Sequence, residues 1–166
     1  IGKVKAFFGN FGVMIKAYTY ILMMGMAGLK LASCDAVLNA NYLKEKLKDA
    51  YNLSYDIPCM HEFVLSAENF KEFHISAMNV AKRLIDYGVH PPTVYFPLIV
   101  HEALMIEPTE SESKAVLDNF VDIMHKIAEE VQIAPELLVE APHDTPVLKV
   151  DEVQAARQLN VRYQKA

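Results

Sequence analysis

The sequence has few cysteines and arginines, and it has no excess of positive charge. Its only cysteines, Cys34 and Cys59, stand far apart without CxxC spacing, which favours a reduced, cytoplasmic protein over a disulfide-bonded one. The formal net charge is −5. Because binding to a phosphate backbone needs a surplus of lysine and arginine, this charge balance argues against nucleic acid as a partner.

The common catalytic and metal-binding motifs are missing as well. The chain has no GxSxG, no P-loop and no GxGxxG. His61-Glu62 and His101-Glu102 each lack the second histidine of an HExxH motif, so a zinc site is not supported. The 166 residues, 52% of them hydrophobic, are still enough for one globular domain with a real core.

Residues 7–29 are strongly apolar, with only Asn10, Lys16 and Thr19 as plainly polar side chains. A membrane-spanning helix needs about 20 apolar residues, and glycines, Asn10 and the central Lys16 interrupt this segment. A helix that is apolar on every side is otherwise buried in protein. We therefore expect residues 7–22 to pack against a large domain, a second copy or a partner subunit, and we expect no membrane association.

Hydrophobic periodicity predicts the element order α-α-β-α-β-β-α, followed by a short last helix. The expected helices lie at 12–24, at 29 to about 50 after a glycine turn at 25–28, at 76–87, from a capping box at 109–112 onward, and at 151–158. The expected strands lie at 59–66, 93–99 and 103–107, and Pro97 requires the middle one to lie at a sheet edge or to be broken. This order predicts an α+β domain with a small antiparallel sheet and helices packed on one face.

The same periodicity predicts which side chains face inward. In the second helix Leu31, Cys34, Leu38 and Tyr42 form one apolar stripe, and Lys44 lies outside it.

In the helix at 76–87, Arg83 and Asp86 are expected in solvent. The clearest apolar face belongs to the helix after the capping box, where it comprises Leu117, Phe120, Val121, Met124, Ile127, Ala128 and Val131.

His90-Pro91-Pro92-Thr93 is the tract whose residue types most suggest a functional site. Its prolines hold the backbone extended before a strand, which would fix a histidine and a hydroxyl at the rim of a cleft. The alternative is a stiff entry into the strand with a surface histidine, and the spacing alone favours that alternative.

Two further residues have competing interpretations. Glu107 leads from a strand toward a helix start, where the helix dipole alone favours a carboxylate, so a functional role is the less favoured interpretation. His61 alternates onto the side of Phe63 and Leu65, where most histidines are hydrogen-bonded core residues.

Six tracts in order give the chain a family resemblance: FGNFG (8–12), AVLNANYL (36–43), HEFVL (61–65), AKRL (81–84), DYGVHPPT (86–93) and MIEPTESE (105–112). With these the sequence resembles the C-terminal end of the glycine-cleavage P-protein, glycine dehydrogenase (decarboxylating), in its two-chain bacterial form. The resemblance covers essentially the whole chain.

The resemblance implies the small C-terminal domain of a fold-type-I enzyme that depends on pyridoxal phosphate (PLP). Such an enzyme decarboxylates glycine and passes the aminomethyl group to the lipoyl arm of the H-protein. The lysine that binds PLP lies in the large domain of that family, which places it upstream of Ile1 and leaves no catalytic or cofactor-binding residue here. Residues 1–50 would then be interdomain helices, and residues 51–166 would be the small domain.

The implied partners are the large domain of the same subunit, subunit 1 of the P-protein, the lipoylated H-protein and glycine, with oligomerisation through the apolar first helix. Closure of the small domain would bring His90, Thr93, His61 and Glu107 to the rim of the cleft. The alternative is a noncatalytic α+β module for binding, regulation or dimerisation.

Overall fold

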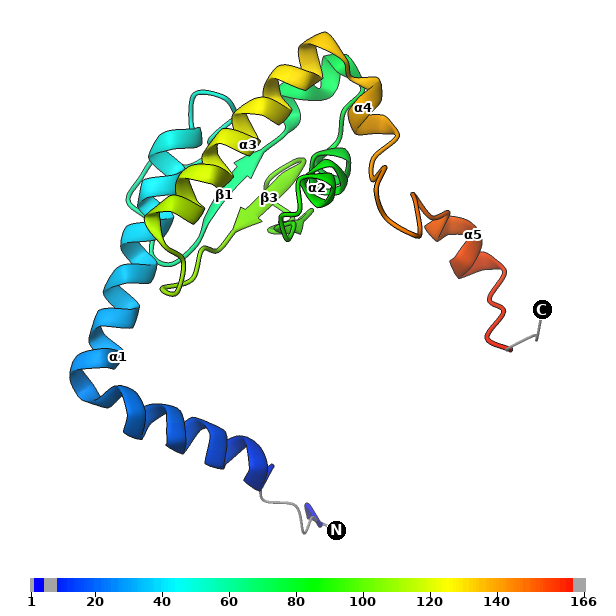
Figure 1. Ribbon diagram of the computed structural model, residues 1–166. Coiled ribbons are helices and arrows are strands. Elements are labelled where there is room, and N and C mark those ends of the chain that lie inside the picture. The colour runs from blue at the N-terminus through cyan, green and yellow to red at the C-terminus, as the bar shows by residue number, and fades with distance from the viewer. Residues whose placement is uncertain (1, 5–8, 163–166) are drawn as a thin grey trace.

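The computed structural model describes residues 2–4 and 9–162 and has the predicted α+β architecture (Figure 1). In chain order the elements are α1 (Phe11–Leu47), β1 (Phe63–Ser66), the short 3-10 helix η1 (Glu68–Phe73), α2 (Ala77–Asp86), β2 (Thr93–Val94), β3 (Ala103–Ile106), α3 (Lys114–Ile133), α4 (Glu136–Val139) and α5 (Glu152–Arg157). The fold class is therefore confirmed. The sequence patterns did not reveal η1 or α4.

The three strands form an antiparallel sheet in the order β1-β3-β2. Phe63 pairs with Ile106, and Leu65 pairs with Leu104. Because directly paired residues point to the same face, these four side chains form one face of the sheet, and all four are buried.

That face belongs to a core to which helices α1, α2 and α3 also contribute. The opposite face, which carries Val64, Met105 and Thr93, is only partly covered. The predicted packing of helices on one face is confirmed.

Helix α1 bends at a single glycine (Figure 1). Gly25 has φ 59° and ψ −178°, a conformation that glycine adopts without steric cost. The predicted break between two helices is therefore real, but it is a one-residue kink and not a four-residue turn. The second half ends at Leu47, a few residues before the predicted end.

The predicted apolar stripe of this helix does not face the core. Leu31 and Leu38 are 61% and 66% exposed, whereas Leu43 and Leu47 are buried. Periodicity identifies an apolar stripe but not the side from which other elements pack. Here they pack only against the last turns of α1. The predicted domain boundary at residue 50 is not tested. The last turns of α1, which precede it, belong to the same hydrophobic core as the residues that follow it.

Lys44, predicted outside, is also buried, at 4% exposed. Its ammonium donates to the carbonyl oxygen of Ile57 at 2.6 Å and lies 4.0 Å from the carboxylate of Asp56. The amide of Asn41 exchanges two hydrogen bonds with the backbone of Cys59. Side chains of α1 thus hold the loop between α1 and β1. The strand predicted to begin at residue 59 begins only at Phe63. Both cysteine thiols are free.

Helix α2 has the predicted start and end. The hydroxyl of Ser76 accepts from the backbone N–H of Asn79, and the Asn79 side chain accepts from the backbone N–H of Ser76, which completes a capping box. Gly88, with φ 70°, follows the last turn.

Helix α3 starts later than predicted. Ser113 caps it by accepting from the N–H of Val116 at 3.3 Å, while Thr109 bonds to Ser111 within a loop. The predicted capping box at 109–112 is therefore wrong. The segment offers several hydroxyls in succession, and tertiary packing selects the one that caps. The predicted apolar face is confirmed: buried are Leu117, Val121, Met124, Ile127, Ala128 and Val131, with Phe120 half-buried.

Strand β2 lies at the sheet edge, is shorter than predicted and ends before Pro97, in agreement with the predicted edge position or break. Residues 95–102 form the loop of the β2–β3 hairpin.

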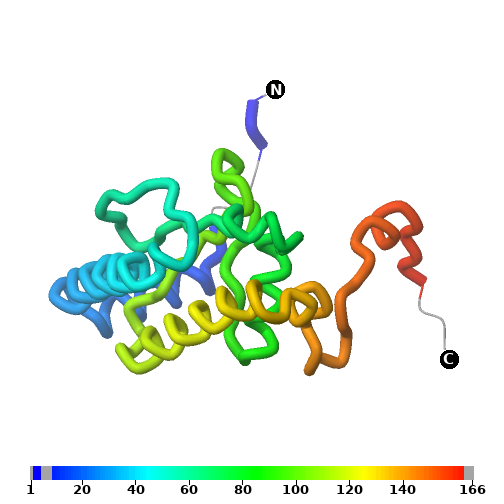
Figure 2. Tube along the Cα trace, turned by 90° about the horizontal axis from the view of Figure 1, so that it is seen from above, coloured from blue at the N-terminus to red at the C-terminus, as the bar shows by residue number. Residues whose placement is uncertain are grey.

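Helix α1 leaves the core on one side and α5 on the other (Figure 1, Figure 2). By length and composition, α1 is the one helix in the described part of the chain that could cross a membrane, and none of its most apolar stretch is buried. Its exposed large apolar residues up to the kink are Phe11, Val13, Met14, Ile15, Tyr18, Tyr20, Ile21, Leu22 and Met23. The expected packing of residues 7–22 against other protein stays a prediction: residues 11–22 are exposed, and Phe7 and Phe8 lie outside the described residues.

Candidate functional site

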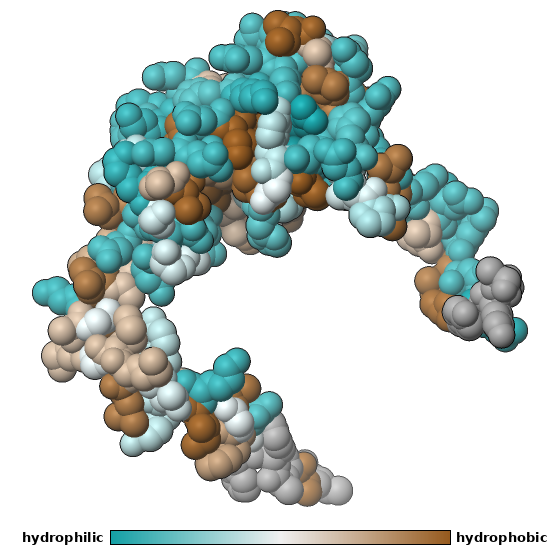
Figure 3. Space-filling view, viewed as in Figure 1, coloured by the Kyte–Doolittle hydropathy of each residue, from teal (hydrophilic) through white to brown (hydrophobic). Residues whose placement is uncertain are grey.

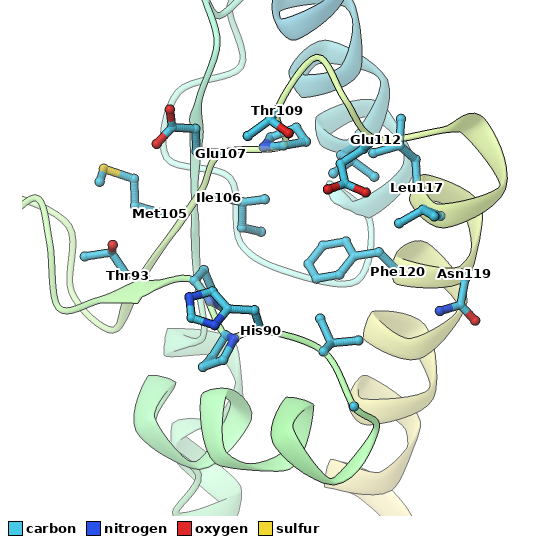
Figure 4. Close-up of a pocket in the computed structure, with 17 residues that line it drawn as sticks. His90, Thr93, Met105, Ile106, Glu107, Thr109, Glu112, Leu117, Asn119 and Phe120 are labelled. Atoms are coloured by element: carbon cyan, nitrogen blue, oxygen red, sulfur yellow. The ribbon is translucent and has the colours of Figure 1, made fainter. Parts of the chain in front are cut away.

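A groove of about 590 Å³ opens beside the sheet, between the segment after α2 and the start of α3 (Figure 4). Its floor is apolar and includes Leu43, Ile106, Leu117 and Phe120. Four tracts that are far apart in the sequence meet here: the end of α1, residues 88–93, β3 with the loop after it, and the first turns of α3.

Three of the four predicted cleft-rim residues line this groove. His90, Thr93 and Glu107 are among its lining residues. His61 is not, but its Nε2 lies 3.8 Å from Oε1 of Glu107. The interpretation of His61 as a core histidine is wrong, since its side chain is 55% exposed. The strand becomes regular only at Phe63, so the alternation does not extend back to His61.

These residues do not converge on one point. Figure 4 shows Glu107 and Thr93 on one side of the strand, while Ile106 and the ring of Phe120 point into the groove. Strand alternation explains this, because Glu107 and Met105 flank Ile106 and Thr93 pairs with Met105. Thr93 and Glu107 therefore belong to the outer edge of the groove, on the open face of the sheet.

Sequence reasoning missed one polar residue that points into the groove. Glu112, interpreted as part of a capping box, turns its carboxylate toward the groove centre (Figure 4). The amide of Asn39 donates to the carbonyl oxygen of Thr109 at 3.0 Å and so fixes this loop to α1. The run of acidic and hydroxyl residues at 107–112 could have indicated a functional loop, but the same residue types are typical of a helix cap.

The groove combines an imidazole, two carboxylates and hydroxyls with an apolar floor. Such a set can bind a cationic group or accept a proton. None of the described residues that line it is a lysine or arginine, so the lining offers neither an amine for covalent catalysis nor a cation for a phosphate. Within the described ranges 2–4 and 9–162, no three His, Cys, Asp or Glu side chains are grouped to hold a metal ion.

The most connected ionic cluster lies elsewhere, between α2, α3 and the loop after α4. The guanidinium of Arg83 bonds to both carboxylate oxygens of Glu130, at 2.8 and 2.9 Å, and to Asp86 at 3.0 Å. Tyr87 donates its hydroxyl to Glu130. Asp86 also accepts from the backbone N–H of His143 at 2.6 Å, and Nδ1 of that histidine lies 2.7 Å away.

The prediction that Arg83 and Asp86 lie in solvent is wrong, since their side chains are only 14% and 3% exposed. The pattern of one helix could not reveal Glu130, which approaches from α3. Burial by itself would raise the pKa of Asp86, but hydrogen bonds from His143, Arg83 and Asp144 lower it below its ordinary value. Burial likewise opposes ionisation of Glu130, but hydrogen bonds from Arg83 and Tyr87 lower its pKa.

This cluster makes the fold sensitive to acid. Because the pKa of Asp86 and of Glu130 is lower in the folded than in the unfolded chain, their contribution to stability is complete above the unfolded pKa. It is lost as pH falls through the folded pKa. We expect the free energy of unfolding to fall below about pH 5. Urea unfolding across pH measures this, and Glu130→Gln should fall less steeply in acid. Equal acid slopes for the two proteins would contradict the assignment.

Comparison with known proteins identifies the chain's relatives. The family model described as "Glycine dehydrogenase, C-terminal domain" matches residues 32–150. A "Probable glycine dehydrogenase (decarboxylating) subunit 2" of Caldanaerobacter subterraneus subsp. tengcongensis is 62% identical over 99% of this chain and 34% of its own length. Proteins of the same name from Listeria innocua and Fervidobacterium nodosum are each 57% identical over 99% of the chain and 34% and 35% of their own lengths.

The chain spans about a third of the length of these curated relatives. The family model covers well over half of the chain, including the ionic cluster and the whole groove. The chain therefore belongs to the glycine dehydrogenase C-terminal domain family.

Proposed function

We propose that this chain is the C-terminal domain of subunit 2 of a two-subunit, cytoplasmic glycine dehydrogenase (decarboxylating), and that it forms one wall of the substrate cleft. The complete enzyme would decarboxylate glycine and pass the aminomethyl group to the lipoyl arm of the H-protein. The observation that carries the proposal is the match over 99% of the chain to relatives with that printed name. The alternative of a noncatalytic binding or dimerisation module has no comparable support.

The described lining of the groove does not fit PLP by itself. PLP enzymes hold their cofactor through a lysine amine, with further groups around its ring and phosphate. The described lining of the groove contains His90, Glu107 and Glu112 but neither lysine nor arginine. We therefore assign PLP in the complete enzyme to residues outside this chain.

The groove suits a wall that closes over a substrate. The prolines at 91 and 92 restrict the backbone beside His90, and Asn39 anchors the loop that carries Glu112. Fixed side chains of this kind can orient a bound molecule or take up a proton without a large rearrangement of the wall. The apolar floor would exclude water once the opposite wall is in place.

Reconstitution tests the proposal. Complete subunit 2, mixed with subunit 1, lipoylated H-protein and PLP, should release labelled carbon dioxide from glycine. The 166-residue chain by itself should neither release it nor retain PLP after dialysis, because its groove supplies no lysine. Absence of glycine decarboxylation by the complete assembly would refute the activity. Stoichiometric PLP on one lysine of the isolated chain, surviving dialysis, would refute the assignment of PLP to other residues.

A further inference from the structure

The last turns of α1 hold two walls of the groove. Tyr42 and Leu43 follow Asn39 by three and four positions, so the three side chains lie on one face of the helix. Leu43 is buried and forms part of the groove floor. Asn39 contacts the loop before α3, and Tyr42 contacts α3 itself. One helix face therefore supplies part of the floor and fixes two neighbouring walls.

The contact of Asn39 meets the backbone of Glu112 at one carbonyl group. The side-chain amide of Asn39 donates to the carbonyl oxygen of Thr109 at 3.0 Å. The backbone N–H of Glu112 donates to the same oxygen at 3.3 Å. A carbonyl oxygen has two lone pairs and can accept both bonds. The hydroxyls of Thr109 and Ser111, 2.7 Å apart, close the loop on itself. The backbone of Glu112 is thus tied to α1 through a shared acceptor.

The Glu112 side chain depends on this backbone for its position. Its carboxylate turns toward the groove centre (Figure 4). In the part of the chain that the structure describes, no ion pair involves this carboxylate. Glu112 also directly precedes Ser113, the residue that caps α3. A shift of the loop would therefore move the carboxylate relative to the other groove walls.

Tyr42 fixes the α3 wall in a similar way. Its hydroxyl donates to the carboxylate of Asp118, and the ammonium of Lys114 donates to the other oxygen of that carboxylate at 2.6 Å. The same ammonium lies 3.3 Å from the Tyr42 hydroxyl and 5.3 Å from the centre of its ring. Leu117 and Phe120, on the same turn of α3 as Asp118, line the groove. This cluster therefore sets the position of the lining turn of α3 relative to α1.

Both contacts belong to a helix that extends well beyond the groove. Helix α1 continues from residues 39–43 back to the kink at Gly25 and into its exposed apolar part. In the space-filling view apolar residues are visible along that part, whereas the visible face of the core is mostly polar (Figure 3). A helix moves as a stiff element, so a displacement of α1 shifts Asn39 and Tyr42 together. The placement of α1 thus sets the shape of the groove.

We propose that Asn39 and Tyr42 are positioning residues for the glycine reaction. Asn39 acts through Thr109 on Glu112, and Tyr42 acts through Asp118 on the α3 wall. The inference rests on the proposed function, in which the groove is a wall of the substrate cleft. Neither side chain lines the groove, so neither contacts a molecule bound in it. Because a displacement of about 1 Å at a reacting group can cost about 10²-fold in rate, loss of either contact should lower turnover.

The kinetic test uses the complete subunit 2 in the reconstituted assembly. Asn39→Leu, which removes the amide at similar size, should lower kcat for glycine at least about tenfold and change the melting temperature by less than about 2 °C. Asn39→Gln keeps an amide donor and should recover most of this loss. Tyr42→Phe, which removes only the hydroxyl, should lower kcat at least about threefold. Asn69→Leu is the matched control, because its amide also donates to a backbone carbonyl, that of Ala50 at 3.1 Å, away from the groove.

A double-mutant cycle separates positioning from a general structural role. If Asn39 acts through Glu112, Asn39→Leu should change kcat by less than about twofold in a subunit that already carries Glu112→Ala. A structural role elsewhere would instead multiply the two losses. Multiplied losses would overturn the proposal for Asn39, and so would wild-type kcat in Asn39→Leu. Wild-type kcat in Tyr42→Phe would overturn it for Tyr42.

Hydrogen exchange tests the anchor of Asn39 without any glycine chemistry. In the complete subunit, backbone amides of residues 110–113 should exchange faster in Asn39→Leu than in Asn69→Leu, while those of α2 stay unchanged. Equal exchange in the two variants would show that Asn39 does not hold the loop. An unaltered assembly that fails to decarboxylate glycine would refute the proposed function, and with it the kinetic role. The exchange comparison reports on the anchor alone.

Discussion

Glu130→Ala is expected to lower the free energy of unfolding by about 3–5 kcal/mol. The Glu130 side chain is 8% exposed and accepts two hydrogen bonds from Arg83 and one from Tyr87. Removing the carboxylate leaves the Arg83 guanidinium, 14% exposed, without its bidentate partner between α2 and α3. Urea unfolding measures the loss, and Glu129→Ala at the exposed neighbouring position is the control.

A second variant separates the cost of an unpaired charge from the value of the pair. In Arg83→Met/Glu130→Leu both charges of this pair are replaced by apolar side chains, while Asp86 keeps the hydrogen bonds from the backbone N–H groups of His143 and Asp144. We expect this double variant to recover much of the stability that Glu130→Ala loses. A loss of less than about 1 kcal/mol in Glu130→Ala would show that the ion pair contributes no more than a surface pair.

His90→Ala is expected to reduce glycine turnover by the complete assembly about 10²-fold while leaving the melting temperature unchanged. His90 is exposed at the groove and belongs to no core cluster, so its removal creates no cavity. Thr93→Ala at the outer edge should act in the same direction. Steady-state release of labelled carbon dioxide and thermal unfolding are the two measurements.

His101→Ala is the matched control, because His101 is also exposed but does not line the groove. Its backbone carbonyl accepts from Ser66, and that bond survives the substitution. Wild-type turnover in both His90→Ala and Thr93→Ala would show that the cleft-rim assignment is wrong and that the 90–93 tract only stiffens the entry to β2.

Elements whose signals are local could be predicted from the sequence. Ser76 and Gly88 delimit α2 as expected, because a cap and a helix stop depend on residues within one turn. Pro97 predicted that the middle strand would lie at a sheet edge or be broken, and β2 lies at the edge and ends before Pro97. The apolar face of α3 is long enough for its periodicity to be unambiguous, and it is the face that packs.

The candidate site could be predicted only in part. His90 and Glu107 were selected one by one, and the structure places both along one groove. Glu112 was missed because the residues around it are also typical of a helix cap. His61 was wrongly assigned to the core because the strand begins two residues later, at Phe63. Nothing in any single tract indicates that residues from α1, β3 and α3 meet.

By itself the sequence determined helix α2, the apolar face of α3, the α+β class and, through six ordered tracts, the family. Only the tertiary structure decided that Lys44 and Glu130 are buried, that Ser113 caps α3, and that the apolar stripe through Leu31 faces away from the core. The physical reason is range. Capping and periodicity act over a few residues, whereas burial depends on which distant segment arrives at a surface, and a local pattern does not contain that partner.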